Sequence, residues 1–132
     1  MSAVNIWAVL VAAVSSFALG GLWYSPVMFY KVWNGEAGRG ENPEKMRHPG
    51  RVFGIAFVFA LIAAWVFAYW LGPHPQMNDA LTKGLAAGAG FVAASFGINY
   101  QFANRSLLMW AIDAGYHTVQ FVIFALVLSL WP

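Results

Sequence analysis

The chain of 132 residues is 61% hydrophobic and only 9% charged, whereas globular chains average about 45–50% and about 25%. A soluble domain of this length has too little interior to bury so much apolar surface. The net charge of +2 rests on seven Lys and Arg residues, too few for a nucleic-acid-binding face, and the absence of cysteine excludes disulfides, thiolate metal sites and cysteine nucleophiles.

Four stretches are long and apolar enough to cross a membrane as helices. A span needs about 20 apolar residues in helical form, because lipid offers no partner to backbone polar groups. The predicted spans lie at about residues 4–24, 52–71, 80–100 and 107–131. We therefore predict an all-α integral membrane four-helix bundle that forms a single domain over residues 1–132. No Lys or Arg precedes the first apolar run, which argues against a cleaved signal peptide.

A serine and a proline follow the first span. Ser25-Pro26 is typical of a helix start, with the serine as N-cap and the proline in the first turn. We therefore predict a short interfacial helix that continues through Phe29 and Trp33. Aromatic rings with an N–H or O–H group suit the boundary between lipid and water. Those expected there belong to Trp23, Tyr24, Tyr30 and Trp33.

The segment at about residues 34–51 is rich in glycine, proline and charge, and we predict that it is a loop. After the second span, residues 72–75 predict a tight break because they contain one glycine and two prolines. Asn78 or Asp79 is expected to cap the third span. Asp79 and Lys83 lie four residues apart, in the order that favours an ion pair on one helix.

Lysine and arginine are distributed unequally between the two ends of the predicted spans. Those between the first and second spans are Lys31, Arg39, Lys45, Arg47 and Arg51. Arg105 lies between the third and fourth spans, on the same side, and Lys83 stands alone on the other. Loops rich in Lys and Arg remain in the cytoplasm. We therefore expect a multi-pass protein of the cytoplasmic (inner) membrane, with its charged loops in the cytoplasm and both termini outside.

Small residues recur every four positions in each predicted span. Within lipid, such residues let helix backbones approach closely. The positions are Ala8, Ala12, Ser16 and Gly20; Ala56, Ala60, Ala64, Ala68 and Gly72; Gly84 and Gly88, with a neighbouring line of Ala86, Gly90 and Ala94; and Ala111 with Gly115. We interpret these stripes as the packing seams of one bundle. The alternative is that one stripe pairs two copies of the chain.

The last span carries the most polar face. Asp113, His117 and Gln120 share one side of a helix by their spacing, and Tyr116 adjoins it. At about 1.5 Å per residue from the start of the span, Asp113 lies about 9 Å in and His117 about 15 Å in. Polar groups within lipid are costly and mark candidate sites. With the polar pair of the third span, the predicted intramembrane polar site comprises Ser95, Asn99, Asp113, Tyr116, His117 and Gln120.

Three interpretations of this polar site remain open. In the first it holds helices together, with Asp113 accepting hydrogen bonds from Asn99, a tryptophan N–H or a loop arginine. In the second, Asp113 and His117 line a wet crevice and exchange protons or hold a cation or a solute. In the third they hold a metal ion, but one Asp and one His supply only two ligands where zinc takes three or four from protein. We therefore predict no metal site.

No motif of a known reaction accompanies these residues. The sequence has no glycine-rich phosphate loop, no His-Glu-x-x-His and no Gly-x-Ser-x-Gly. Ser106 and His117 lie about three helical turns apart, too far for a nucleophile and its base. We therefore expect a non-enzymatic protein without a cofactor, and an enzyme acting on lipid is the less favoured alternative.

Two groups of residues carry a resemblance to a known family. They are Gly21-Leu22-Trp23-Tyr24-Ser25-Pro26 with Phe29 and Trp33, and Asn99, Phe102, Arg105-Ser106 and Asp113-Ala114-Gly115-Tyr116-His117 with Val119. In these residues the chain resembles the domain of unknown function 1761 family, whose members are small membrane proteins with four predicted spans. Ala125 departs from the pattern, because a glycine is expected there. The resemblance implies a four-helix domain, bacterial and in the cytoplasmic membrane, and it implies no reaction.

Two functional hypotheses follow. The first is a membrane protein, expected to be a homo-oligomer, whose polar site handles a proton, an ion or a small solute. The second is an accessory subunit that packs against a larger membrane complex, with the aromatic segment at residues 22–33 as its docking surface. Both place the chain in a lipid bilayer and neither involves nucleic acid.

Overall fold

The computed structural model describes residues 4–36 and 49–131, and every regular element within these ranges is helical. In chain order the elements are α1 (Ile6–Trp23), α2 (Tyr30–Glu36), α3 (Pro49–Leu71), α4 (Met77–Leu85), the π-helix η1 (Ala86–Val92), α5 (Ala93–Phe102) and α6 (Leu107–Leu130). The described segments long and apolar enough to cross a membrane are Ile6–Trp23, Gly50–Leu71, Met77–Phe102 and Leu107–Leu130. The predicted all-α membrane bundle of four long helices, with a short helix after the first, is therefore confirmed.

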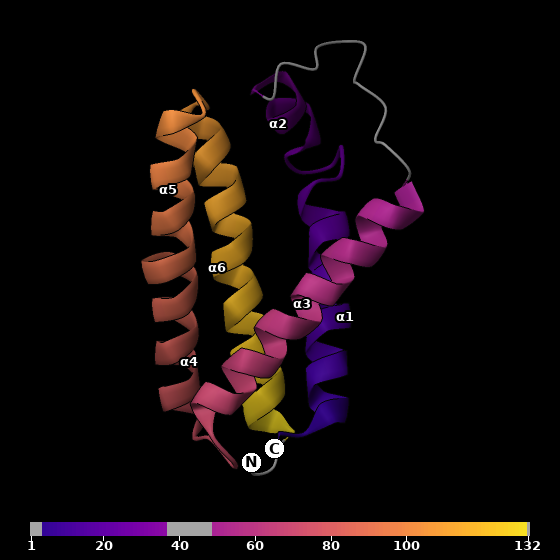
Figure 1. Cartoon of the computed structure of the whole chain (residues 1–132), viewed down its shortest axis with the longest axis vertical. Helices are drawn as coiled ribbons and strands as arrows, with labels where there is room; N and C mark the ends of the chain where they lie inside the picture. Colours follow the sequence, from indigo (N-terminus) through magenta and orange to yellow (C-terminus); the bar gives the residue numbers. More distant parts are fainter. Residues whose placement is uncertain (1–3, 37–48, 132) are drawn as a thin grey trace.

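The helix α6 is the centre of the bundle. The elements α4, η1 and α5 follow one another without a break and form one rod that packs along α6, while α1 packs on another side of it (Figure 1). The helix α3 crosses obliquely and packs mainly against α1. The end of α1, the helix α2, the start of α3 and the end of α5 lie at one end of the bundle.

Side-chain caps fix where the first and last spans begin. The Asn5 side chain accepts hydrogen bonds from the backbone N–H groups of Trp7 and Ala8, at 3.1 and 3.2 Å, and so starts α1. In the same way Ser106 Oγ accepts from the backbone N–H of Met109, at 3.0 Å, and starts α6. The amide of Asn5 also donates to the carbonyl oxygen of Trp131, at 3.3 Å, which joins the start of α1 to the end of α6.

The predicted start of the short helix is wrong. The helix α2 begins at Tyr30, and residues 25–29 form turns instead. The Ser25 carbonyl accepts from the backbone N–H groups of Met28 and Tyr30, and the Ser25 hydroxyl donates to the Leu22 carbonyl at 2.7 Å. Because this hydroxyl donates back to α1, it does not cap a new helix. Most of the predicted loop at 34–51 lies outside the described residues.

The predicted cap of the third span is also wrong. The helix α4 begins at Met77, after Gln76, whose side chain makes no capping hydrogen bond. Asp79 therefore lies within the first turn, where its negative charge interacts favourably with the positive end of the helix dipole and so stabilises α4. The ion pair with Lys83 forms as expected, with 3.2 Å between the Lys83 Nζ and the Asp79 Oδ2.

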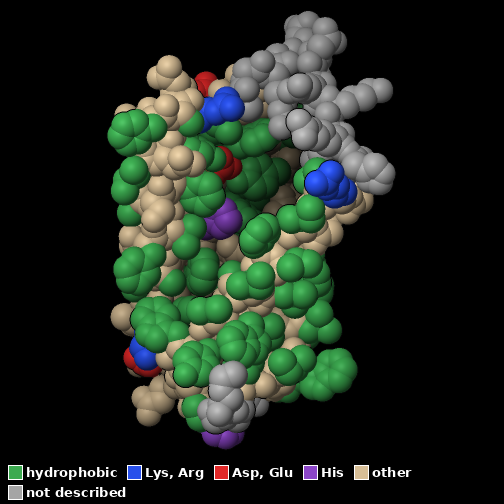
Figure 2. Space-filling view, viewed as in Figure 1, with side chains coloured by type: hydrophobic (Ala, Val, Ile, Leu, Met, Phe, Trp, Pro, Cys, Tyr) green, Lys and Arg blue, Asp and Glu red, His purple; other side chains and the backbone are tan. Residues whose placement is uncertain are grey.

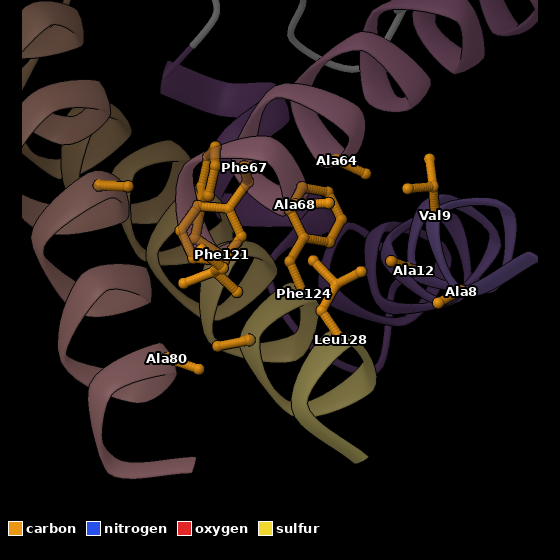
Figure 3. Packing of buried hydrophobic residues seen from close by; sticks show 13 residues of the cluster. Ala8, Val9, Ala12, Ala64, Phe67, Ala68, Ala80, Phe121, Phe124 and Leu128 are labelled. Atoms are coloured by element: carbon orange, nitrogen blue, oxygen red, sulfur yellow. The ribbon is translucent and has the colours of Figure 1, made fainter. Parts of the chain in front are cut away.

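The end of the bundle nearest Asn5 has a close-packed apolar core. The Phe121 ring lies between those of Phe67 and Phe124, with centroid distances of 5.5 and 5.2 Å. Around these rings, small residues let the helices approach closely (Figure 3). They include Ala8, Ala12, Ala64, Ala68 and Ala80. This end of the bundle is sealed by tightly packed apolar side chains.

The small-residue stripes form packing seams only in part. On α3, Ala60, Ala64 and Ala68 are buried, but Ala56 is exposed. On the third span the backbones of Gly84 and Gly88 pack directly on α6. The stripe positions that instead face outward are Ala56, Ala86, Gly90, Ala94 and Ala111.

Candidate functional site

A buried carboxylate, Asp113, lies on α6 and accepts hydrogen bonds from three aromatic side chains. The Tyr24 hydroxyl donates to its Oδ1, and the Tyr100 hydroxyl donates to its Oδ2. The Trp33 Nε1 donates to Oδ2 as well, at 3.3 Å. An indole N–H can only donate, and an ionised carboxylate can only accept. The arrangement therefore suits the charged form of Asp113, which is 6% exposed.

The donors come from three different elements. Tyr24 is the C-cap residue of α1, Trp33 lies on α2, and Tyr100 lies on α5. The turns at residues 25–29 lead from Tyr24 into α2, which contacts α6 at this end of the bundle. The Tyr24 and Trp33 rings meet edge to face, with centroids 5.8 Å apart. Asp113 thus ties α1, α2 and α5 to α6.

A second tryptophan fixes the end of α1. The Trp23 Nε1 donates to the carbonyl oxygen of Ile112, at 2.9 Å. Its ring lies so close to Gly115 that an added Cβ there would come within 2.9 Å of Trp23 Cζ2. Trp23, Tyr24 and Trp33 therefore direct their polar atoms at α6, although the sequence predicted only an interfacial position for them.

Burial raises the pKa of Tyr24 above its ordinary value, and the hydrogen bond to Asp113 adds to this effect. Tyr24 lies just beyond the end of the first span, Ile6–Trp23. Its hydroxyl therefore keeps its proton at physiological pH and remains a donor to Asp113.

His117 and Gln120 form a second polar group on α6, about one and two helical turns after Asp113. The His117 Nδ1 lies 2.8 Å from the Gln120 Oε1. Because an amide oxygen only accepts, the Nδ1 carries a proton and donates. The His117 ring stacks on Phe96, with 5.0 Å between centroids and 15° between planes. Tyr116 lies at its other side, 4.9 Å between centroids, and its hydroxyl donates to the Ser16 carbonyl at 3.0 Å.

Aromatic rings connect these two polar groups into one feature. Tyr24 contacts both Trp33 and Tyr116, and Phe96 contacts both His117 and Tyr100. Since Tyr116 also contacts His117, the rings follow one another in a chain whose two ends meet at Asp113. We call this feature the aromatic collar; its rings are those of Trp33, Tyr24, Tyr116, His117, Phe96 and Tyr100.

The collar is near a hollow on one side of the bundle and ends above the apolar core. Figure 2 shows this face hollowed in its upper half, with acidic and histidine surface visible among apolar side chains. After Gln120, the next buried residues of α6 toward its end are Phe121 and Phe124, which belong to the apolar core. The polar groups therefore extend over one part of the bundle and do not cross it.

The structure brings together four of the residues predicted for the intramembrane site, namely Asp113, Tyr116, His117 and Gln120. It leaves out Ser95 and Asn99, which are exposed and line a shallow groove on the outer face of the rod with Phe91 and Phe96. Asn99 is therefore not a donor to Asp113; the neighbouring Tyr100 is. Successive helix residues point about 100° apart, so Tyr100 facing α6 turns Asn99 away.

The sequence reasoning missed the two tyrosine donors. A carboxylate within a span needs donors at its own depth, and tyrosine is a donor that an apolar helix can carry to that depth. Tyr24 ends the first predicted span, Tyr100 ends the third, and Asp113 lies near the corresponding end of the fourth. A comparison of these depths in the sequence could therefore have identified Tyr24 and Tyr100 as the donors to Asp113.

The other residues that carry the family resemblance contribute less to the site. Phe29 packs on Trp23, with ring centroids 5.0 Å apart, while Pro26 is exposed in the turn. Arg105 is exposed between α5 and α6, and its backbone N–H donates to the Tyr100 carbonyl at 2.9 Å. This contact helps to end α5 just after the residue that binds Asp113.

These features define a multi-pass helical membrane protein with a carboxylate enclosed by aromatic side chains. The profile of the family described as protein of unknown function DUF1761 matches residues 7–129. The chain therefore belongs to this family, as the resemblance of its two residue groups indicated. No curated protein and no solved structure matches the chain. The family description names no activity, so a function is argued from the site.

Proposed function

We propose that this chain is a non-enzymatic protein of the cytoplasmic membrane that binds a proton, an ion or a small solute at Asp113. The observation that carries the proposal is a buried carboxylate whose donors come from three other elements, beside a hollow in the bundle. The three donors use three of about four lone-pair positions of the carboxylate, so a proton or a cation can still bind there. Because these donors belong to α1, α2 and α5, loss of the charge on Asp113 weakens the bonds that join these elements to α6.

A purely structural role explains this arrangement less well. Burying a charged group costs more than burying a neutral one, and a neutral amide also accepts hydrogen bonds from tyrosine and tryptophan. If the donors served only to join the helices, an asparagine would serve at lower cost. The carboxylate supplies what the amide lacks, which is a charge that can be neutralised.

The sealed core favours a binding site over an open channel. The polar groups end at Gln120, and the rings of Phe121, Phe124 and Phe67 lie beyond it. A solute that reached His117 from the hollow has no polar route onward in this conformation. Transport through this protein therefore requires a second conformation in which this core opens.

A pH titration of tryptophan emission tests the proposal, because Trp33 contacts Asp113 directly. The titratable groups around Asp113 are Tyr24 from α1, Tyr100 from α5 and His117 on its own helix. Arg105, between α5 and α6, also acts electrostatically on Tyr100. We expect the emission of purified wild-type protein to depend on pH, and Asp113→Asn to lose that dependence. His117→Ala isolates the contribution of the histidine.

Asp79→Asn is the matched control, since Asp79 is an exposed carboxylate at the other end of the bundle. This variant is expected to keep the pH-dependent change that Asp113→Asn loses. Identical titrations for wild type and a folded Asp113→Asn would refute the proposal. In liposomes, loss of a proton-linked flux in Asp113→Asn distinguishes transport from binding alone.

For orientation, we propose that the charged loops face the cytoplasm and that both termini lie outside. The exposed Lys31, Arg51 and Arg105 all belong to elements at one end of the bundle, whereas Lys83 pairs with Asp79 at the other. Positive side chains are retained on the cytoplasmic side.

The second candidate, an accessory or self-associating subunit, is favoured by one observation. The first part of α3 is exposed on almost every side from Arg51 to Phe59, with Phe57 packing on Phe17 as the exception. The aromatic segment at 22–33 is less available, because Trp23, Tyr24 and Trp33 already bond to α6. Purification in mild detergent with identification of bound chains tests this candidate, and recovery of a single copy alone counts against it.

A further inference from the structure

The aromatic collar combines one negative charge with ring surfaces on several sides. Tyrosine and tryptophan donors satisfy the hydrogen bonds of Asp113, but they are neutral and leave its charge in place. Between described residues, the ion pair within 4.0 Å is that of Lys83 and Asp79, at the other end of the bundle. From this geometry we propose, building on the proposed function, that the collar binds an alkylammonium group as the counter-ion of Asp113.

The charge of Asp113 favours a cation over other ligands. In a medium of low dielectric constant, attraction between opposite charges is several times stronger than in water. An anionic ligand is repelled there. A neutral ligand gains nothing from the charge and must compete with the tyrosine donors for the carboxylate.

The surroundings favour an organic cation over a metal ion. Divalent metals take three or more oxygen or nitrogen ligands, and among the described residues no group of three His, Cys, Asp or Glu side chains gathers. Aromatic faces instead attract ammonium groups, which they contact within about 6 Å of the ring centroid. The rings of Phe96 and Tyr116 pack next to those of Tyr100 and Tyr24, which bond Asp113, so the carboxylate lies among aromatic groups.

The position of the collar allows two sources for the ammonium group. Asp113 lies about 9 Å into the last span, in the half of the bundle that carries the end of α1 and the helix α2. The hollow opens on a side face of the bundle (Figure 2). The ammonium of a phospholipid headgroup and that of a small amphiphilic amine share this chemistry, and the experiment separates them.

Calorimetric titration of the full chain in detergent micelles tests the proposal with choline and with 3,3-dimethylbutan-1-ol. These probes have nearly the same shape, but the alcohol has a carbon atom in place of the charged nitrogen. We expect saturable binding of choline and at least tenfold weaker binding of the alcohol. Equal binding of the two probes, or no binding of choline, overturns the proposal. This comparison uses the wild type and depends on no variant.

Variants then locate the site. Asp113→Asn should remove the preference for choline over the alcohol. Phe96→Leu removes one collar ring and should weaken choline about two- to fivefold, the effect of one exposed cation–π contact. Its matched control is Phe91→Leu on the same rod, since Phe91 is 68% exposed and outside the collar. Loss of choline binding in Phe91→Leu equal to that in Phe96→Leu contradicts the assignment to the collar.

Nanodiscs of two lipid compositions show whether the ammonium group comes from a lipid headgroup or from a soluble amine. If phosphatidylethanolamine headgroups occupy the collar, choline binds more weakly in discs of that lipid than in phosphatidylglycerol discs, at a salt concentration that screens the negative charge of phosphatidylglycerol. Equal affinity in both discs assigns the site to a soluble amine. If the emission titration still depends on Asp113 while no ammonium probe binds, this inference fails and the proposed function stands. If Asp113→Asn matches wild type in both measurements, both fail.

Discussion

Tyr24 performs two tasks at one position in the chain. Its backbone closes α1 through hydrogen bonds to Gly20 and Leu22, and its hydroxyl bonds to Asp113. A change at this residue therefore affects both the end of the first span and the charge of the site. Because the side chain acts through one hydroxyl group, the two tasks can be separated by removing that group alone.

Tyr24→Phe keeps the ring and removes one donor to Asp113. We expect the free energy of unfolding to fall by about 1.5–3 kcal/mol, the usual contribution of a hydrogen bond to a charged group. Denaturant titration in detergent micelles measures this change. Tyr69→Phe is the control, because Tyr69 is 57% exposed and stacks on Trp65, and it should leave stability unchanged. Equal stability of Tyr24→Phe and wild type would show that the bond does not hold the bundle together.

At the residue scale, helical periodicity was enough to place Asp113, His117 and Gln120 on one face. It could not assign their partners, because these belong to other elements. Tyr100 and Asn99 are adjacent in sequence, and which of them faces α6 depends on the rotation of α5 about its axis. That rotation is set by the packing of the rod, including Trp110, whose Nε1 donates to the Ala93 carbonyl at 2.7 Å.

Among the elements, the π-helix η1 has the clearest effect on the site. A π-helix adds a residue to each turn, so it changes which residues of the following helix face the bundle. The site residues Phe96 and Tyr100 both follow η1 on α5. Nothing in the hydrophobic pattern distinguishes a π-helix from an α-helix, so the sequence predicted a regular span here.

The close approach of η1 to α6 depends on Gly88. An added Cβ at Gly88 would lie 2.7 Å from the Thr118 Cα and 3.0 Å from the His117 carbonyl oxygen, both backbone atoms that cannot move independently. Gly88→Ala should therefore lower the free energy of unfolding by about 1–3 kcal/mol, as overpacking does. Gly90→Ala is the matched control in the same element, because nothing lies within 4 Å of its Cβ position. Thermal unfolding in detergent compares the two, and a Gly88→Ala variant as stable as Gly90→Ala contradicts the packing.

Span positions were predictable because length and charge decide them, and the predicted and observed ends agree within about one turn. Caps were less predictable. Ser25 has the side chain of an N-cap, but its hydroxyl donates to α1, and Gln76 precedes α4 without a capping bond. A short polar side chain can bond to either of two neighbouring backbone segments, and tertiary packing decides between them.

For the whole molecule, the sequence does not determine how the helices are arranged around α6. The stripe from Ala56 to Gly72 is continuous in sequence, but α3 crosses obliquely and the alanines of the stripe are buried only from Ala60 onward. Small residues permit close contact at any of these positions without requiring it. The hollow beside the collar exists because the first half of α3 diverges from the bundle.

The absence of cysteine makes the orientation of the whole molecule directly measurable. Glu36→Cys and Asn78→Cys place single thiols at exposed positions at opposite ends of the bundle. On intact cells, a membrane-impermeant maleimide should label Asn78→Cys, and should label Glu36→Cys only after the membrane is disrupted. The wild-type chain is the unlabelled control. The reverse pattern of labelling would place the charged loops outside.

The hydrogen bond between Asn5 and the Trp131 carbonyl has a practical consequence. Since the first and last spans meet at the same end of the bundle, a short flexible peptide can connect the last residue of one copy to the first residue of the next without an additional crossing of the bilayer. Covalently joined doublets and triplets of this chain can thus be produced from a single gene. Their activity as a function of repeat number then gives the stoichiometry of the working assembly.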